Sequence, residues 1–259
     1  MQVHPTAMVG PEVELGAGVT VGPYCIIEGP VRVGAGTRLL SHVFVQGPTE
    51  VGEDCCFHPF SAIGSPPQDL KYQGEPTGLV IGSRNVFRES MTVNRGTAGG
   101  GGVTRVGDDN FFMALTHIAH DCQLGSHLIL GNATTLAGHV TVEDHAIIGA
   151  YSGVHQFCRV GTHSFIGGYS VITRDTLPYV KTVGSRNEAR IYGLNRVGLE
   201  RKGFSLEALE ALERAYRVLF RSRLNTHDAL ARLRQSGLRT PEVDTLARFI
   251  ETSERGFVR

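Results

Sequence analysis

The chain has 259 residues, and its 25 basic and 25 acidic side chains leave a formal net charge of zero. This balance argues against a protein that coats a polyanion, so no nucleic-acid partner is expected. Hydrophobic residues make up 41% of the chain, which is enough to bury a core, yet no apolar run is long enough to cross a bilayer. We therefore expect a soluble, folded protein without stable membrane insertion.

The beginning of the chain and its cysteines indicate the compartment. The first ten residues contain neither the basic nor the apolar segment of a secretory signal. Five cysteines are an odd number, which favours reduced thiols over a disulfide framework. We expect a cytoplasmic protein.

A period of six residues organises the chain from Val3 to Ile172. An aliphatic residue or phenylalanine recurs at this spacing in 26 hexads, with two interruptions. Six residues match one short strand plus a bend, and stacked units of this kind can share parallel ladders. Three hexads would close one triangular coil of 18 residues. The pattern therefore predicts an all-β fold, a single-stranded parallel β-helix of nearly nine coils over residues 1–176.

Two further positions of the hexad are informative. The residue after the aliphatic one is glycine in 13 hexads, which suits a corner that needs unusual backbone angles. The fifth position is small or β-branched, and four of the five cysteines occupy it. These thiols, Cys25, Cys55, Cys122 and Cys158, are therefore expected to fill interior corners.

The two interruptions lie near residues 65–80 and 97–105. The first is polar, contains three prolines and keeps the register of the hexads, so it should project as a loop. The second contains four consecutive glycines and shifts the phase by one residue. Long loops on a rigid scaffold are common places for function.

After Ile172 the pattern changes twice. Residues 177–204 form a connector, and the segment from Arg159 to Lys202 carries eight basic and three acidic side chains. Residues 205–259 predict a small helical subdomain, because their apolar residues recur at helical spacing. A first helix follows Ser205, a second covers about 225–235, and a third has Thr240 as its N-cap. The apolar face of the first comprises Leu206, Leu209, Leu212, Tyr216, Leu219 and Phe220.

Residues 18 apart should stack on one wall of the prism at about 4.8 Å. His120 then lies next to Gly138, which is followed by Gln156 and Arg174. A glycine beside a histidine presents a backbone N–H close to the imidazole. This arrangement suits a general base next to an oxyanion donor.

Three more histidines, His117, His139 and His155, fall in the same coils, although each alone could be an outward polar position. Asp121 follows His120, but neighbours on a strand point to opposite faces, so adjacency establishes no dyad unless a corner intervenes. Three imidazoles could also hold zinc with an open position, as in hexapeptide carbonic anhydrases. That scaffold explains neither the first insertion nor the helical tail.

Four motifs carry a resemblance to a known family. They are QDLKYQGEPT at residues 68–77, HIAHDC at 117–122, LAGHV at 136–140 and VHQF at 154–157. With the hexads, they make the chain resemble the UDP-N-acetylglucosamine acyltransferases of lipid A biosynthesis over essentially its whole length. The resemblance implies a left-handed β-helix and a homotrimer with its active sites between neighbouring prisms. It also implies transfer of a 3-hydroxyacyl group from acyl carrier protein to the 3-hydroxyl of UDP-N-acetylglucosamine, the first step of that pathway.

The resemblance also assigns residues. His120 matches the general base, Gly138 matches the oxyanion donor, and Gly168 matches the position that sets acyl chain length. The other substrate contacts that it implies are Gln68, Asp69, Lys71, His117, His139, His155, Gln156, Asn195 and Arg201. No cofactor, metal or covalent intermediate is expected, and the basic segment offers a docking surface for an acidic carrier protein.

Three positions depart from the family pattern. Val197 stands in place of an acid, Lys202 in place of an arginine, and Asn94 in place of a histidine before an Arg-Gly-Thr sequence. Since lysine cannot bind phosphate as a planar fork, nucleotide binding is the least secure transfer. Two alternatives stay open at this stage: a 3-amino sugar as acceptor, giving an amide, and a CoA-dependent sugar acetyltransferase on the same scaffold. The preferred acyl length also stays open.

Overall fold

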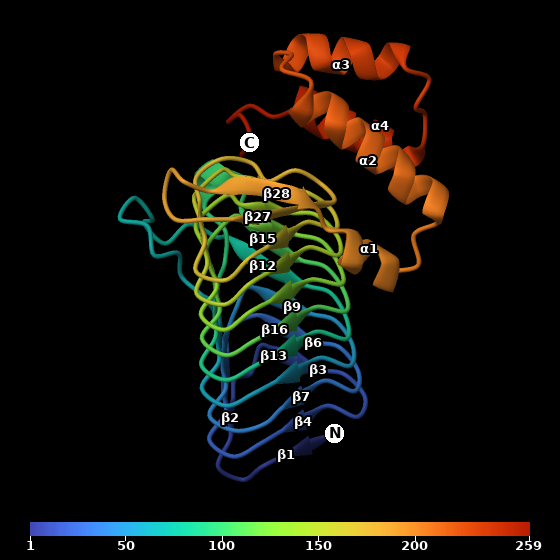
Figure 1. Ribbon diagram of the computed structural model, residues 1–259. Coiled ribbons are helices and arrows are strands. Elements are labelled where there is room, and N and C mark those ends of the chain that lie inside the picture. Colours follow the sequence, from blue (N-terminus) through green and yellow to red (C-terminus); the bar gives the residue numbers. More distant parts are fainter.

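A computed structural model describes residues 1–259 and confirms the parallel β-helix that the hexads predict (Figure 1). Three sheets form the walls of a triangular prism, with 11, 9 and 8 strands. Consecutive strands of one sheet are one coil apart, as in the pairing of His117 with Thr135. None of the helices combines the length and the apolar character that a bilayer-spanning segment requires.

The strands alternate between the three sheets in chain order. The first sheet contains β1 (Gln2–Val3), β4 (Thr20–Val21), β7 (Arg38–Leu39), β10 (Cys56–Phe57), β13 (Val86–Phe87), β16 (Phe111–Phe112), β19 (Ile129–Leu130), β22 (Ile147–Ile148), β25 (Phe165–Ile166), β27 (Val180–Val183) and β28 (Arg190–Leu194). The second contains β2 (Met8–Val9), β5 (Ile26–Glu28), β8 (Phe44–Gln46), β11 (Ala62–Ser65), β14 (Thr92–Asn94), β17 (His117–Ile118), β20 (Thr135–Leu136), β23 (Gly153–Val154) and β26 (Val171–Ile172). The third contains β3 (Val13–Leu15), β6 (Val31–Val33), β9 (Thr49–Val51), β12 (Gly78–Ile81), β15 (Val103–Val106), β18 (Gln123–Leu124), β21 (Thr141–Val142) and β24 (Arg159–Val160).

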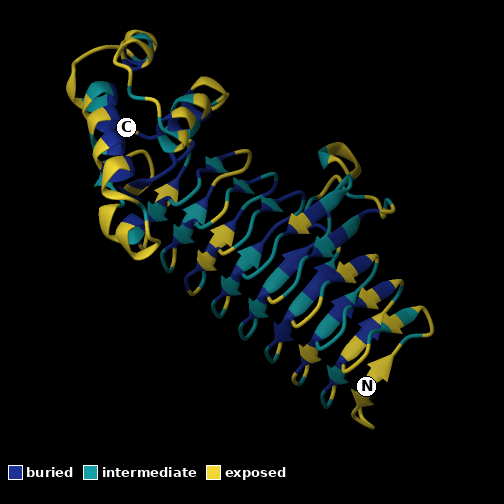
Figure 2. Cartoon of the chain, turned by 90° about the vertical axis from the view of Figure 1, so that its right-hand side faces the viewer, coloured by how far each residue is buried: buried dark blue, intermediate teal, exposed yellow.

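The hexad side chains fill the interior of the prism. From Val21 onward they are almost completely buried, and Figure 2 shows this buried core along the length of the prism. The rings of Phe57 and Phe87 stack inside with centroids 4.6 Å apart, and Phe112 continues the column. All five cysteines are free and buried, as expected for the four at interior corners; the fifth, Cys56, lies on β10.

The glycines that follow the aliphatic position are needed for a reason other than the expected one. Apart from Gly64, none of the 13 has a positive φ. They are instead sites of close backbone approach, since a Cβ at Gly22 would lie only 1.3 Å from the carbonyl oxygen of Leu40. Positive φ falls two residues later, at corner residues such as Asp121 and His139, with φ values of 60° and 63°. Aspartate, asparagine and histidine tolerate this conformation better than most residues.

The connector contains two strands that the sequence pattern did not predict. β27 pairs in parallel with β25, and β28 pairs antiparallel with β27, so the first sheet continues past the last hexad. The connector ends in α1 (Arg196–Arg201). β27 and β28 thereby carry the chain across the end of the prism to the helices (Figure 1).

The predicted C-terminal helices are present as α2 (Leu206–Arg221), α3 (Thr226–Gln235) and α4 (Pro241–Glu251). Their N-caps are Ser205, Asn225 and Thr240, each accepting a backbone hydrogen bond through its side chain. The apolar face of α2 packs into a second core with α4, but Leu206 at its start is 64% exposed and does not belong to that face.

The two insertions behave differently. Residues between β11 and β12 project from the prism, as predicted, and are the teal loop in Figure 1. The segment between β14 and β15 contains a single 3-10 turn (Ala98–Gly100), and Thr97 and Gly100 contact Asp121. The second insertion is therefore packed onto the wall next to the histidine cluster.

A ladder of three histidines marks the corner between the third and first sheets, called here the His145 corner. The rings of His127, His145 and His163 stack with centroids 4.7 and 4.5 Å apart. Tyr179 and Phe204 from the connector contact the last ring. Burial lowers the pKa of His163 to about 4, with smaller contributions from His145 and Lys202, so this ring is neutral in the folded protein near pH 7.

The ladder should make the protein sensitive to acid. The pKa of His163 is depressed in the folded state, so its contribution to stability is complete above about pH 6.5. That contribution is lost as the pH falls from about 6.5 to 4, because in this range the unfolded chain binds the proton and the folded protein does not. The expected loss is about 1 to 3 kcal/mol after allowing for solvent screening. His163→Phe keeps an aromatic ring in the stack and should reduce the loss. The comparison is the urea midpoint at pH 7.5 and pH 5 for both proteins, and equal shifts would contradict the assignment.

Candidate active site

His120 lies in the turn between β17 and β18, at the corner between the second and third sheets, called here the His120 corner. Its Nδ1 is 2.8 Å from Oδ2 of Asp121, and its side chain is 15% exposed. Because a carboxylate can only accept hydrogen bonds, Nδ1 carries the proton and Nε2 is left free to act as a base. The corner therefore creates the dyad that strand geometry alone could not establish.

Gly138 lies one coil further along the same corner, directly against the imidazole. A Cβ at this position would lie 2.6 Å from Cε1 and 2.8 Å from Nε2 of His120. Gly138 is buried, and its N–H donates no hydrogen bond within the chain. The structure thus places His120 against Gly138, as the 18-residue spacing predicts.

His139 and Phe157 complete this wall. The ring of His139 meets that of His120 edge to face at 5.1 Å and stacks on Phe157 at 4.4 Å. His139 Nε2 is 3.8 Å from Asp121 Oδ2. Burial lowers the pKa of His139, so this ring is neutral near pH 7 and offers a hydrogen-bonding group to a ligand.

Asp121 is the neighbour of His120 whose role the sequence left open. Its side chain is completely buried, and it accepts hydrogen bonds from the backbone N–H and the hydroxyl of Thr97 as well as from His120. The signal that could have revealed it is its place in the hexad, three residues after Ile118, where the chain turns.

His117 lies on β17, facing outward next to Ile118. Its Nδ1 is 2.7 Å from the hydroxyl of Thr92 on the adjacent strand. Burial, together with the nearby His120, lowers the pKa of His117. The ring is therefore a neutral neighbour of His120, and the Thr92 hydroxyl, which can donate or accept, holds its orientation.

The first insertion reaches towards this corner. Asp69 is close enough to His139 for its charge to favour protonation of that ring. Asp69 Oδ1 accepts a hydrogen bond from the N–H of Lys71, which shapes the tip of the loop. Gln68 and Lys71 are exposed and make no side-chain hydrogen bond with the His120 corner.

The remaining predicted residues lie partly at the His120 corner and partly far from it. His155 and Gln156 are exposed at the His120 corner one coil beyond Gly138, and Gly168 is exposed in the turn between the first and second sheets. Asn195 donates to the carbonyl of His163 at the His145 corner, and Arg201 ends α1. A single chain therefore does not bring the predicted nucleotide and acyl-chain contacts to the catalytic pair.

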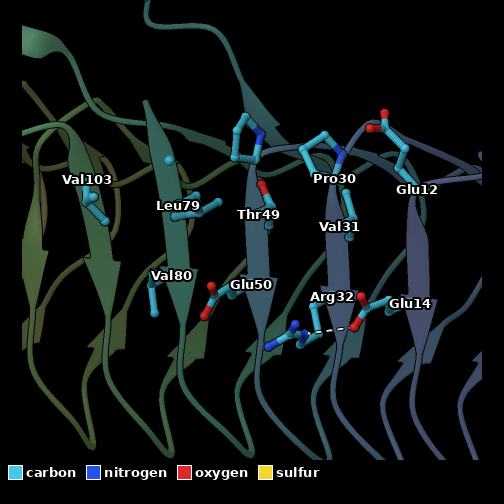
Figure 3. A pocket seen from close by; sticks show the side chains of 12 residues that line it. Glu12, Glu14, Pro30, Val31, Arg32, Thr49, Glu50, Leu79, Val80 and Val103 are labelled. Atoms are coloured by element: carbon cyan, nitrogen blue, oxygen red, sulfur yellow. Dashed lines mark hydrogen bonds and ion pairs between the residues drawn. The ribbon is translucent and has the colours of Figure 1, made fainter. Parts of the chain in front are cut away.

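A cavity of about 320 Å³ on the outer face of the third sheet contains none of the predicted residues (Figure 3). Glu14, Arg32 and Glu50 lie on neighbouring strands there, and Arg32 bonds to Glu14 at 3.0 Å. Such an alternating row of charges stabilises strand pairing. It offers no convergent group for catalysis.

Two family models match the chain. The hexapeptide model of bacterial transferases matches residues 139–174, and the second domain of UDP-N-acetylglucosamine O-acyltransferases matches residues 175–258. An acyl-[acyl-carrier-protein]–UDP-N-acetylglucosamine O-acyltransferase from Alkalilimnicola ehrlichii is 51% identical over 100% of this chain and 99% of its own length. The corresponding enzyme from Thermodesulfovibrio yellowstonii is 46% identical over the same shares. The chain belongs to this acyltransferase family.

Solved structures agree with this assignment. The UDP-N-acetylglucosamine O-acyltransferase of Moraxella catarrhalis matches with a TM-score of 0.95 at 42% identity, covering 100% of this chain and 100% of that one. The acyltransferase of Francisella novicida matches with a TM-score of 0.96 at 35% identity, covering 100% of this chain and 94% of that one. The fold and the helical tail are therefore shared with solved members of the family.

Two features bear on other chemistry at the site of this acyltransferase. Burial raises the pKa of Cys122 to about 12 and that of Cys158 to about 11, so neither is a thiolate nucleophile near pH 7. His120, Asp121 and His139 have ligand atoms within 4.8 Å of one another, as a metal site would. Both oxygens of Asp121, however, already accept hydrogen bonds from the protein.

The three departures from the family pattern have different surroundings. Asn94 is buried and donates to the carbonyl of Pro66, so it supports the base of the first insertion. Val197 is 59% exposed on α1, and Lys202 follows that helix near the histidine ladder. The substitution at Asn94 is thus structural, whereas the other two lie where nucleotide contacts are expected.

Proposed function

We propose that the chain transfers a 3-hydroxyacyl group from acyl carrier protein to the glucosamine 3-hydroxyl of UDP-N-acetylglucosamine, which the resemblance places first in lipid A biosynthesis. The family assignment supports the substrates. The observation that carries the chemistry is the imidazole of His120 against Gly138, with Nε2 unbonded and Nδ1 held by Asp121.

In the proposed mechanism, His120 Nε2 takes the proton of the sugar hydroxyl as the oxygen attacks the thioester carbonyl carbon. The tetrahedral oxyanion accepts a hydrogen bond from the N–H of Gly138, which makes none within the chain. Collapse of this intermediate breaks the carbon–sulfur bond, and the departing thiolate of the carrier takes the proton back from Nε2. Asp121 stabilises the imidazolium formed between these steps through Nδ1.

Transfer is direct, from a ternary complex of enzyme, donor and acceptor. Cys122 and Cys158 are held protonated inside the prism, so they do not form an acyl-enzyme. The four histidines near the site supply hydrogen bonds and proton transfer without a cofactor. This proposal predicts no burst of free carrier protein in the absence of UDP-N-acetylglucosamine.

The proposed substrate contacts lie at the His120 corner, at the His145 corner with α1, and in the turn between the first and second sheets. Gln68, Asp69, Lys71, His117 and His139 would hold the sugar at the His120 corner, with His155 and Gln156 lining the cleft beyond it. Asn195 and Arg201 would contact the nucleotide, and Gly168 would face the acyl chain. Because these groups lie at different corners of one prism, we propose a homotrimer in which neighbouring copies complete each site.

The carrier protein would dock at the C-terminal end of the prism, and the reaction would take place in the cytoplasm. A cavity of about 420 Å³ there is lined by Arg174, Arg190 and Arg259 and by no acidic residue. Arg174 continues the column of His120, Gly138 and Gln156. An acidic carrier bound at these arginines would direct its acylated arm along the column to the base.

The decisive experiment offers the purified protein 3-hydroxyacyl carrier proteins of graded length with UDP-N-acetylglucosamine and identifies the products by mass. An alkali-labile ester on the sugar is expected. Parallel reactions contain a UDP-linked 3-amino sugar, whose amide product resists alkali, and acetyl-CoA as donor. Turnover with only the amino sugar or only acetyl-CoA would overturn the proposal.

Gly168 should control acyl length. A Cβ there would meet only the backbone of Ala150, 3.1 Å from its carbonyl oxygen and 3.8 Å from its nitrogen, so a side chain fits after a small adjustment and extends outward. Gly168→Met should move the preferred donor to a shorter chain by occupying space that the acyl group needs. The same panel of carrier proteins measures it, and an unchanged length profile would remove this role.

A further inference from the structure

We propose that Thr97 is a positioning residue for the catalytic dyad and that the glycine-rich insertion exists to deliver it. This inference rests on the proposed function of His120. It concerns the two groups of Thr97, its N–H and its hydroxyl, that hold the carboxylate of Asp121. Neither the hexad pattern nor the family resemblance gave the second insertion a role.

Thr97 contacts both oxygens of the Asp121 carboxylate. Its N–H donates to Oδ1 at 2.8 Å, and its hydroxyl donates to Oδ2 at 2.6 Å. The same Oδ2 accepts from His120 Nδ1 at 2.8 Å. Three donors thus fix the plane of the carboxylate, and that plane in turn fixes the direction of the imidazole.

The insertion also covers the carboxylate. A Cβ on Gly100 would lie 2.0 Å from Cγ of Asp121, so only glycine permits the 3-10 turn to close over this group. After the turn, the hydroxyl of Thr104 accepts from the N–H of Asp121 at 2.8 Å. Residues 97–104 therefore bracket Asp121 and leave its side chain without exposed surface.

The four glycines of the insertion are not equivalent. Gly99, Gly101 and Gly102 have open space where a Cβ would be, and only Gly100 touches Asp121. Gly101 and Gly102 have positive φ, whereas Gly99 does not. Gly99→Ala is therefore a matched control for Gly100→Ala, since it changes the same loop without meeting the carboxylate.

This arrangement has a specific consequence for catalysis. A buried carboxylate with a fixed plane keeps the proton of His120 on Nδ1 and turns Nε2 towards Gly138. Without the Thr97 hydroxyl, Oδ2 loses one of its two donors and the carboxylate can rotate. The imidazole then loses its orientation, although nothing that contacts the substrate has been removed. The chemical step should slow while substrate binding is retained.

The test compares Thr97→Val, which keeps the shape of the side chain, with Thr97→Ser, which keeps the hydroxyl. Thr97→Val should lower kcat about 10- to 100-fold with KM changed less than about threefold, because the lost hydrogen bond orients the dyad and does not bind the substrate. Thr97→Ser should restore most of the rate. Gly100→Ala should lower kcat similarly, and Gly99→Ala should not. A Thr97→Val enzyme within threefold of wild type, or a Thr97→Ser enzyme as slow as Thr97→Val, would overturn the proposal.

A second readout does not depend on turnover. NMR spectra of protein labelled with ¹⁵N-histidine report which ring nitrogen carries the proton. The wild-type protein should show His120 with its proton on Nδ1, and Thr97→Val should show a mixture of tautomers. If the wild type turns over none of the offered substrates but the tautomer shifts as expected, the proposed reaction fails while the positioning role stands. An unchanged tautomer in Thr97→Val would overturn the positioning role whatever the activity.

Discussion

Replacement of His120 by alanine should lower kcat at least about 100-fold, because a general base typically contributes 10²- to 10⁴-fold. The imidazole lies at the surface of a corner, 15% exposed, and its removal empties no part of the prism core. The variant should therefore keep the melting temperature of the wild type within a few degrees. Steady-state transfer to UDP-N-acetylglucosamine measures the first quantity and calorimetry the second.

His227→Ala is the control for this experiment. It also removes a histidine, but one that is 92% exposed on α3, outside every substrate contact proposed above. Its turnover should stay close to that of the wild type. If His120→Ala retained more than about a tenth of the wild-type rate, His120 could not be the base.

Gly138→Ala should lower kcat by about as much as His120→Ala, although it adds only a single methyl group. The new Cβ would occupy space 2.6 Å from Cε1 and 2.8 Å from Nε2 of His120, so the imidazole must move by about an ångström. Misplacement on this scale costs about 100-fold in rate, and blocked access to the N–H of Gly138 adds to the loss. We expect kcat to fall by about 100- to 1000-fold while the protein remains folded.

The matched control is Gly153→Ala in β23, where a Cβ would meet nothing within 4 Å and φ is not positive. Its rate should lie within about twofold of wild type. Equal activities of the two alanine variants would show that the contact between Gly138 and His120 has no role in the reaction. The pair separates the effect of the contact from the general cost of replacing a glycine in the prism.

Much of the fold was predictable because the hexad repeats one local rule many times. The period identifies every strand from β1 to β26, and the spacing of 18 places Gly138 against His120 without any coordinates. The caps at Ser205, Asn225 and Thr240 similarly mark the helices, since each cap is a local interaction.

What could not be predicted depends on contacts between distant segments or on backbone detail. The dyad of His120 and Asp121 requires the turn conformation of Asp121, and the strand rule for neighbouring residues does not apply there. The contact of Thr97 with Asp121 joins residues 24 apart across an aperiodic insertion. β27 and β28 lie outside the hexad repeat, so its period could not predict them.

Because Gly138 stacks on His120 one coil further along the same corner, the number of coils in the prism can differ between related proteins only at certain places. Each coil packs on the one before it in the same way, so adding or deleting a complete turn of 18 residues below β11 would alter the height of the prism and leave His120, Gly138 and the first insertion where they are. A single residue gained or lost between them would instead rotate one group off the shared edge. The number of coils near the N-terminus can therefore vary among related proteins, whereas the length of the segment that joins His120 to Gly138 cannot.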